Sequence, residues 1–386
     1  MVRRTRVRKM LHWARAATMV LPMSLRDRLA ELVSYDTQNP SGRERPLCDK
    51  LAAELRALGA ATVEVAEVGT HAGPHAYVYA RFGAGTPRLL LNAHVDTVPA
   101  NSGYATPPHT LTARDGRLVG LGSADTKGAI AAILEALARR RPAGNLGVLF
   151  SGDEERSGSC MRAFLDSTNA RGIERAIVCE PTSCRVGSRH RGIGAALASA
   201  TGPGGHSSRV DNIDNPIAIL ARAAVALDDF GREQRDRGPD GFRGICLNVA
   251  ALDGGIAFNV VPTRATLSMS LRPAPGTVVG ELLAEAGRRA RAAVAPHTIE
   301  WDVRKENPPF ATRDIAAFEP LLGARTRQPV DLAFWTEAAL LSDAGIDAVV
   351  FGPGDIAQAH AADEFVTMAD LETAQAAFEQ VLVAPT

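Results

Sequence analysis

The chain has 386 residues, with 43 basic and 43 acidic side chains. This length allows two domains with a full-sized core, and the balanced charge gives no surplus of either sign that would favour nucleic acid or an anionic membrane as a partner. No apolar run reaches the roughly 18 residues that a membrane-spanning helix needs. We therefore expect a globular protein with a full-sized core.

The five cysteines are scattered and odd in number (Cys48, Cys160, Cys179, Cys184 and Cys246). They fit a reducing compartment, and hence a cytoplasmic location, better than a disulfide framework. No close pair of cysteines suggests a thiolate site. Any metal would be held by histidines and carboxylates, a ligand set that favours a catalytic over a structural site.

Residues 1–22 contain five arginines and one lysine but no acid. Arg15 interrupts their apolar part, so the uninterrupted apolar region of a signal peptide does not form. We expect a disordered tail or a start site assigned too early, and we expect the fold to begin at Met23.

The first half of the chain alternates helical and strand patterns. Helical apolar spacing covers 24–33, 46–58 and 129–140, and strand patterns cover 62–68, 75–82, 88–94, 146–150 and 175–179. A late strand is expected over 347–351 and a closing helix over 369–383. This alternation predicts an α/β fold whose mixed, mostly parallel sheet has helices on both faces.

The middle of the chain has a different character. Strands are expected over 192–201, 245–252, 264–272 and 299–303, and helices over 215–228 and 277–294. We interpret 188–304 as an inserted α+β lid or dimerisation domain, with a four-stranded antiparallel sheet and two helices. Residues 23–187 and 305–386 would then form one discontinuous catalytic domain.

Polar residues follow directly after the apolar strands. The strand over 88–94 ends in His94, and Asp96 lies two residues on, so both side chains can share a face. An imidazole backed by a carboxylate is typical of a metal ligand and its orienting partner, although a simple hydrogen-bonded pair fits equally. Asp125, in a glycine-rich loop before a helix, is a candidate ligand that as an isolated signal would be read as an N-cap.

Two further strands end in acids. The strand over 146–150 leads into Asp153, Glu154 and Glu155, and the strand over 175–179 leads into Glu180. Consecutive carboxylates repel one another unless positive charge balances them, and a solvated acidic turn is the alternative. Because the carboxyl ends of parallel strands share one edge of a sheet, where ligands bind, we expect these side chains to converge.

Five motifs occur in one order: His94-Val-Asp96, Gly122 to Gly128, Asp153-Glu-Glu155, Glu180-Pro-Thr182 and Ala359-His360 to Glu364. Together they resemble the M20 family of dinuclear metal amidohydrolases, over nearly the whole chain from about residue 24. The segments 335–338 and 351–365 are similar to the acetylornithine deacetylase branch of that family.

The resemblance implies two divalent ions, with zinc favoured and cobalt or manganese also suitable. His94, Asp125 and Glu180 would hold one ion, and Asp125 would bridge to a second ion held by Glu155 and His360. In the same way Glu154 would be the general base, and Asp96 would orient His94. The family also tends to have a cis peptide bond after the bridging aspartate, here Asp125–Thr126.

The resemblance also assigns residues of the inserted domain. His206 would reach the active site of a partner subunit in a homodimer and stabilise the oxyanion, although an exposed loop histidine can equally be idle. Asn259 and Arg272 match positions that contact substrate. Arg272 suits a clamp for an α-carboxylate, and a strand-end salt bridge is the alternative.

The activity implied is hydrolysis of the acetamide of an N-acetyl amino acid, N-acetylornithine or N-acetylcitrulline, in arginine biosynthesis. A succinyl-diaminopimelate desuccinylase, a dipeptidase or a carboxypeptidase stays open as an alternative. A non-catalytic binding protein is disfavoured, because all five ligand positions and Glu154 are present.

Overall fold

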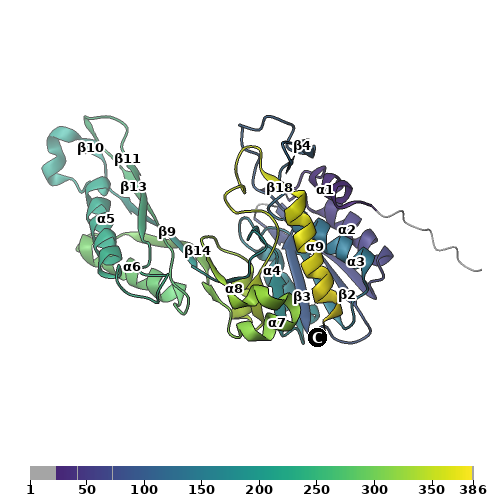
Figure 1. Cartoon of the computed structure of the whole chain (residues 1–386). Helices are drawn as coiled ribbons and strands as arrows, with labels where there is room; N and C mark the ends of the chain where they lie inside the picture. Colours follow the sequence, from purple (N-terminus) through teal and green to yellow (C-terminus); the bar gives the residue numbers. More distant parts are fainter. Residues whose placement is uncertain (1–22, 41, 72, 385–386) are drawn as a thin grey trace, which may run out of the picture.

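The computed structural model describes residues 23–40, 42–71 and 73–384, so the predicted tail lies outside the described residues. The chain forms a larger body around a nine-stranded sheet and a smaller lobe around a four-stranded sheet, which project apart in Figure 1. No helix of the described part is long and apolar enough to cross a membrane.

The large sheet is mixed, and its four central strands are parallel. The order is β1 (Thr62–Thr70), β2 (Gly73–Phe82), β6 (Leu146–Ser151), β3 (Leu89–His94), β7 (Arg175–Val178), β17 (Asp347–Val350), β8 (Gly187–His190) and β15 (Phe310–Ala311), with β16 (Val330–Leu332) paired to β8. The predicted strands of the first half all form.

Helices cover both faces of this sheet, as predicted (Figure 1). One face packs against α1 (Leu25–Val33), α2 (Arg45–Ala57), α3 (Lys127–Arg139), α7 (Glu319–Leu322) and α9 (Met368–Val383); the other packs against α4 (Ser159–Asp166) and α8 (Ala338–Asp343). Within β3, Leu89 and Leu91 face the first core and Leu90 faces the second. Since side chains alternate along a strand, His94 at the end of β3 shares the face of Leu90.

Several short elements lacked a readable period in the sequence. Three of them, β4 (Thr112–Arg114), β5 (Arg117–Val119) and β18 (Phe365–Thr367), form a small sheet. The short 3-10 helices are Thr168–Ala170, Ser207–Asn212, Ile315–Phe318 and Gly323–Arg327. The pairing of β18 with β5 matters for function, because it places the end of the chain beside the loop that carries Asp125.

The smaller lobe has the predicted strands and helices. Its sheet runs β11 (Asn248–Gly254), β13 (Arg264–Leu271), β9 (Ile193–Thr201), β14 (Glu300–Asn307), and it packs against α5 (Pro216–Glu233) and α6 (Val279–Val294) around a core of its own. At the far end, β10 (Gly205–His206) pairs with β12 (Val260–Val261). The predicted bounds need correction, because 188 falls inside β8 of the large sheet and 304 falls inside β14. That the lobe is an independent domain stays a proposal.

Candidate active site

Four neighbouring parallel strands carry the predicted ligand positions at their carboxyl ends. In sheet order, β6 leads into the acid turn 153–155, β3 ends at His94, β7 leads into Glu180, and β17 leads through a loop to His360. Parallel pairing holds these four strand ends at one edge, the usual place for a ligand in such sheets. The strands that carry the predicted residues are therefore neighbours in the sheet.

Direct contacts join the candidate ligands around Asp125. One carboxylate oxygen, Oδ1, lies 2.9 Å from Nε2 of His94, and the other, Oδ2, lies 3.4 Å from Nε2 of His360. The same nitrogen of His360 lies 3.0 Å from Oε1 of Glu155. Potential ligand atoms of His94, Asp125 and Glu155 all lie within 4.8 Å of one another. Asp125 thus occupies the middle position that a bridging ligand requires.

The carboxylates of this cluster repel one another electrostatically. Burial raises the pKa of Glu180 well above its ordinary value, and repulsion from Asp125 adds to the rise. Burial likewise raises the pKa of Glu155, again with a contribution from Asp125. Asp125 itself has a lowered pKa, because hydrogen bonds with His360 and His94 outweigh its burial. The protein thus packs several acids against the imidazoles of His94 and His360, which supply positive charge in direct contact with Asp125.

In the described chain, protonated His360 and His94 supply positive charge that balances the carboxylates. Hydrogen bonds to Asp125 and Glu155 raise the pKa of His360 to about 10. Burial opposes charge on His94, but its bonds to Asp125 and Asp96 raise its pKa well above the ordinary value. Cations that bind here would displace these protons, since ligating imidazole is neutral.

Asp96 holds two parts of the site. Its backbone carbonyl lies 2.9 Å from Nδ1 of His94, so Nδ1 carries the proton and Nε2 faces Asp125. The Asp96 carboxylate, 3.6 Å from the same nitrogen, accepts the backbone N–H groups of Glu154 and Glu155 at 3.2 Å each. It also accepts a bond from the side-chain amide of Asn39. The buried carboxylate therefore fixes the acid turn, and the backbone carbonyl of the same residue orients the histidine.

Glu364 was part of a sequence motif but had no assigned role. Its buried carboxylate accepts the backbone N–H groups of Gly122 and Ala124 at 2.9 Å and of Asp125 at 3.0 Å. Burial raises its pKa to about 7, with a contribution from Asp125. These bonds order the loop that presents Asp125, in which the Asp125–Thr126 peptide bond is cis, as the resemblance implied.

Glu337, within the segment 335–338, is a second buried acid that sequence reasoning left without a role. It accepts a hydrogen bond from Oγ of Ser151 at 2.6 Å, at the end of β6. Burial raises its pKa to about 7. Burial also raises the pKa of Glu154 well above its ordinary value, and repulsion from Glu155 and Glu337 adds to that rise. The candidate base therefore sits where its affinity for a proton is increased.

Comparison with known proteins agrees with this geometry. Residues 90–384 match peptidase family M20/M25/M40. The chain belongs to this family. It is 37% identical to N-acetyl-L-citrulline deacetylase of Xanthomonas campestris pv. campestris, over 90% of this chain and 94% of the relative. It is 31% identical to acetylornithine deacetylase of Proteus mirabilis, over 78% of this chain and 81% of the relative.

Solved structures share the fold of this M20 chain. An M20 metallo-carboxypeptidase of Sulfolobus solfataricus superposes with a TM-score of 0.75 and 18% identity, covering 92% of this chain and 97% of the other. A protein of Bacillus subtilis, described as a dinuclear metal-binding peptidase of the M20 family, superposes with a TM-score of 0.67 and 16% identity, covering 93% and 97%.

The donors of this M20 chain fit a metal centre. Imidazole nitrogens and carboxylate oxygens are the ligands that zinc and similar divalent ions take. Negative charge is in excess at the edge of the sheet, and Asp125 lies between two histidines that approach it from different strands. The residues present therefore suit divalent cations.

The lobe residues are placed differently. His206 and Asn259 are exposed at the far end of the lobe, where β10 lies away from the large sheet (Figure 1). Nδ1 of His206 accepts bonds from the N–H and hydroxyl of Ser208, and the Asn259 carbonyl accepts the N–H of Ser207. Within the described chain neither side chain contacts the acid cluster.

Arg272 lies at the other end of the lobe, immediately after β13. It is exposed, and its charge is felt by Lys305 of β14. Partial burial lowers the pKa of Lys305, and this ammonium also interacts with Glu154 of the acid turn. The lobe thus places the cation Lys305 within electrostatic reach of the candidate base, with Arg272 near Lys305. Lys305 gave no signal in the sequence, since a lysine in an exposed strand is ordinary.

Proposed function

We propose that this chain removes the acetyl group from an N-acetyl amino acid, N-acetyl-L-citrulline or N-acetyl-L-ornithine, in arginine biosynthesis in the cytoplasm. The observation that carries the proposal is the gathering of His94, Asp125, Glu155 and His360 at the carboxyl ends of neighbouring parallel strands, with Glu154 in the acid turn beside them. The names of the relatives, which match most of this chain, support the choice of acetylated substrates.

Two divalent ions, zinc favoured and cobalt suitable, would be held by His94, Asp125 and Glu180 and by Asp125, Glu155 and His360. When bound, they would supply polarisation of the acetyl carbonyl and a lowered pKa of water.

Glu154 would act as the general base. It takes a proton from the water that adds to the acetyl carbonyl carbon, and it delivers that proton to the nitrogen as the carbon–nitrogen bond breaks. Its raised pKa suits both roles, because a base must also release the proton as an acid within the same turnover. Asp96 keeps Glu154 in register through the backbone bond at 3.2 Å.

Arg272 would bind the α-carboxylate of the substrate, since a guanidinium can donate two parallel hydrogen bonds to a carboxylate. Lys305, whose charge interacts with both Arg272 and Glu154, would add to the positive potential between them. The resulting field favours a substrate with one free carboxylate beside its amide, as an N-acetyl amino acid has.

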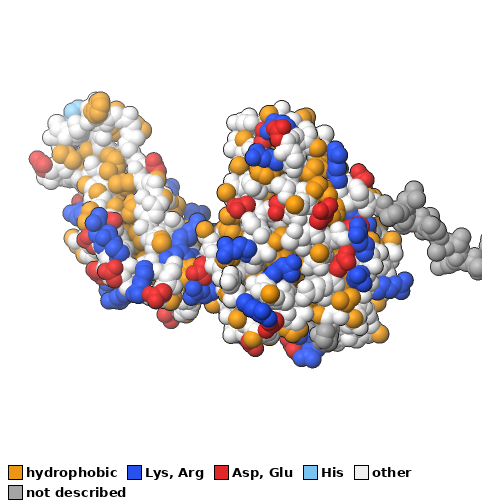
Figure 2. Space-filling model, in the orientation of Figure 1, with side chains coloured by type: hydrophobic (Ala, Val, Ile, Leu, Met, Phe, Trp, Pro, Cys, Tyr) orange, Lys and Arg blue, Asp and Glu red, His pale blue; other side chains and the backbone are white. Residues whose placement is uncertain are grey.

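The chain would work as a homodimer in which His206 and Asn259 enter the site of the partner subunit. Figure 2 shows apolar side chains on the surface at this end of the lobe, and five large exposed ones belong to segments that carry or adjoin these two residues: Val210, Leu252, Ile256, Phe258 and Val260. Large apolar side chains in such a group are typical of a surface that is covered in the working assembly. His206 would donate a hydrogen bond to the oxyanion that forms on the acetyl oxygen.

A substrate panel tests the proposal. The purified enzyme is assayed with N-acetyl-L-citrulline, N-acetyl-L-ornithine, N-succinyl-diaminopimelate and a dipeptide, before and after exhaustive chelation. We expect kcat/KM to be highest for one acetylated amino acid and activity to return when zinc or cobalt is added back. Preference for the succinyl or peptide substrate would reassign the enzyme within the family, and full activity in excess chelator would remove the metal centre.

A further inference from the structure

A second cavity lies at the opposite edge of the large sheet from the active site. It has a volume of about 540 Å³, within the range of small-molecule sites. Its walls come from β1, β2, the segment 86–87 ahead of β3 and the turn 168–172 ahead of β7. Arg81 on its floor pairs with Gly147 near the start of β6, whereas the acid turn follows the end of β6. Gly147 and Asp153 are six residues apart along β6 and the turn that follows it, which is roughly 20 Å of extended chain.

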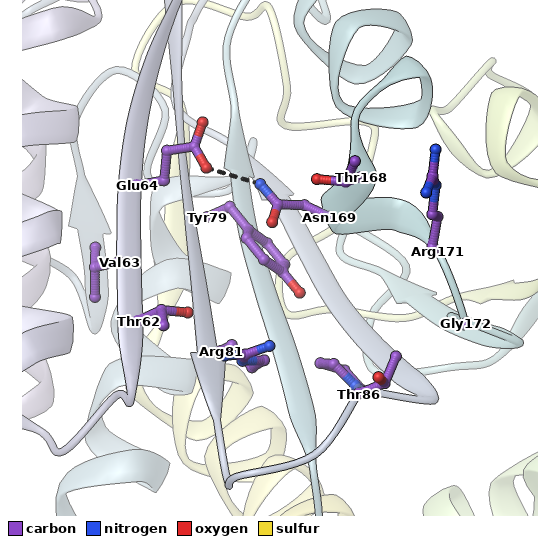
Figure 3. A pocket seen from close by; sticks show the side chains of 11 residues that line it. Thr62, Val63, Glu64, Tyr79, Arg81, Thr86, Thr168, Asn169, Arg171 and Gly172 are labelled. Atoms are coloured by element: carbon purple, nitrogen blue, oxygen red, sulfur yellow. Dashed lines mark hydrogen bonds between the residues drawn. The ribbon is translucent and has the colours of Figure 1, made fainter.

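The floor of the cavity is positive and rich in donors. In Figure 3 the guanidinium of Arg81 and the hydroxyl of Tyr79 lie close together at one end of the cavity, with the side chain of Thr86 beside them. Nε of Arg81 is buried without a hydrogen-bond partner, and the side chain forms no ion pair among the described residues. Burial raises the pKa of Tyr79 to about 12, with Arg81 opposing the shift, so the phenol keeps its proton at neutral pH. An unpaired buried donor is an uncommon feature that a ligand acceptor would satisfy.

The rim completes a charge pattern. Arg171, which likewise forms no ion pair within the described chain, stands at one side of the opening (Figure 3). Glu64 stands at the end of the cavity away from Arg81, held by a 2.8 Å bond from the side-chain amide of Asn169. Because an ionised carboxylate has several acceptor positions, Glu64 can take a second donor beside Asn169.

We propose that this cavity binds a free amino acid, with the carboxylate on Arg81 and an ammonium group at Glu64. A guanidinium flanked by hydroxyls recognises a carboxylate, and the separated acid recognises a cation. A simple anion could accept hydrogen bonds from Arg81, Tyr79 and Thr86, but its negative charge would then face the carboxylate of Glu64. The site is independent of the proposed deacetylation, since it shares no residue with the metal cluster.

Calorimetric titration of the full-length enzyme tests the proposal with L-lysine, glycine, succinate and inorganic phosphate. Lysine carries a carboxylate and an ammonium at its two ends, whereas succinate carries a carboxylate at both. We expect saturable binding of lysine or glycine, at least tenfold weaker in Arg81→Gln and several-fold weaker in Glu64→Gln. Arg26→Gln, which removes an exposed arginine on α1, is the matched control and should bind like the unchanged enzyme.

The variants also report on folding and on the place of binding. Arg81→Gln should keep the kcat and the circular dichroism spectrum of the unchanged enzyme. If Arg81→Gln does not fold, the test rests on Glu64→Gln, because Glu64 is exposed and a glutamine there can still accept the hydrogen bond from Asn169. The proposal is overturned if neither amino acid binds saturably, or if both cavity variants bind them as the unchanged enzyme does, which would place binding at the active site. Tighter binding of succinate or phosphate than of either amino acid would also overturn it.

Discussion

The acid cluster at the edge of the large sheet and the exposed tip of the lobe are two parts of one proposed active site, but they are built in opposite ways. In the cluster His94, Asp125, Glu155 and His360 contact one another within the chain, and buried carboxylates such as Asp96 and Glu364 fix the backbone of the neighbouring loops. At the tip, His206 and Asn259 point to no partner among the described acids, and apolar side chains surround them. The contrast teaches that one chain can bring its candidate metal ligands together and still hold the proposed substrate-binding residues His206 and Asn259 away from them.

The sharpest way to test the cluster is Glu154→Gln, which keeps the shape of the side chain and removes its basicity. We expect kcat to fall by about 10³-fold or more, within the scale of general base catalysis, while the bound metal content stays the same. Glu372→Gln, at an exposed position of α9, is the control and should leave kcat unchanged. Substantial turnover by Glu154→Gln would move the base elsewhere in the site.

The tip can be tested by mixing two inactive subunits. His206→Ala should lower kcat by about 10²- to 10³-fold through loss of an oxyanion donor. If His206 acts on the partner's site, refolding or exchanging it with Glu154→Gln subunits should restore roughly a quarter of the original activity, because half of the subunit pairs are mixed and one site in each is intact. Two inactive parents that give an inactive mixture, with exchange shown by mass spectrometry, would confine His206 to its own chain or to no role.

The support beneath the cluster should have a smaller effect. Glu364→Gln removes one of the two oxygens that accept backbone N–H groups in the loop carrying Asp125. We expect metal affinity to weaken by about 10- to 100-fold, the usual cost of losing an orienting partner. Competition with a chromophoric zinc chelator measures the change. An affinity equal to that of the unchanged enzyme would mean that the loop is ordered without Glu364.

The smallest effect is expected in the pH dependence of folding stability. Glu337 has a folded-state pKa of about 7, above its ordinary 4.5, so it is held neutral by burial. The protonated side chain therefore contributes fully to the free energy of unfolding below pH 4.5, and this contribution is lost as the pH rises through 7. Glu337→Gln should therefore gain about 1–2 kcal/mol relative to the unchanged, metal-free protein between pH 5 and pH 8. Urea unfolding at several pH values measures this gain, and parallel stability curves would show that Glu337 titrates normally.

The strand ends could be predicted from the sequence because buried parallel strands are continuous apolar runs, and each run stops at a polar ligand. The runs that end at His94 and before Glu180 show both features directly. Roles that depend on distant contacts could not be predicted. Glu364 acts through a loop some 240 residues earlier, and it is placed there by β18, whose three residues are too few to show a period. The proposed role of Lys305 could not be predicted either, because it depends on the electrostatic interaction with Glu154 and Arg272 that the fold creates.

The pairing of β18 with β5 has a consequence for how the enzyme folds during its synthesis. The acid that orders the loop of Asp125 lies 239 residues later in the sequence, and the histidine that contacts Asp125 lies close to that acid. A chain emerging from the ribosome can therefore complete most of its sheet and still lack the means to assemble the cluster. The cluster would form only after His360 and Glu364 have been translated, and a nonsense codon ahead of His360 would yield a product that has most of the sheet but lacks both side chains.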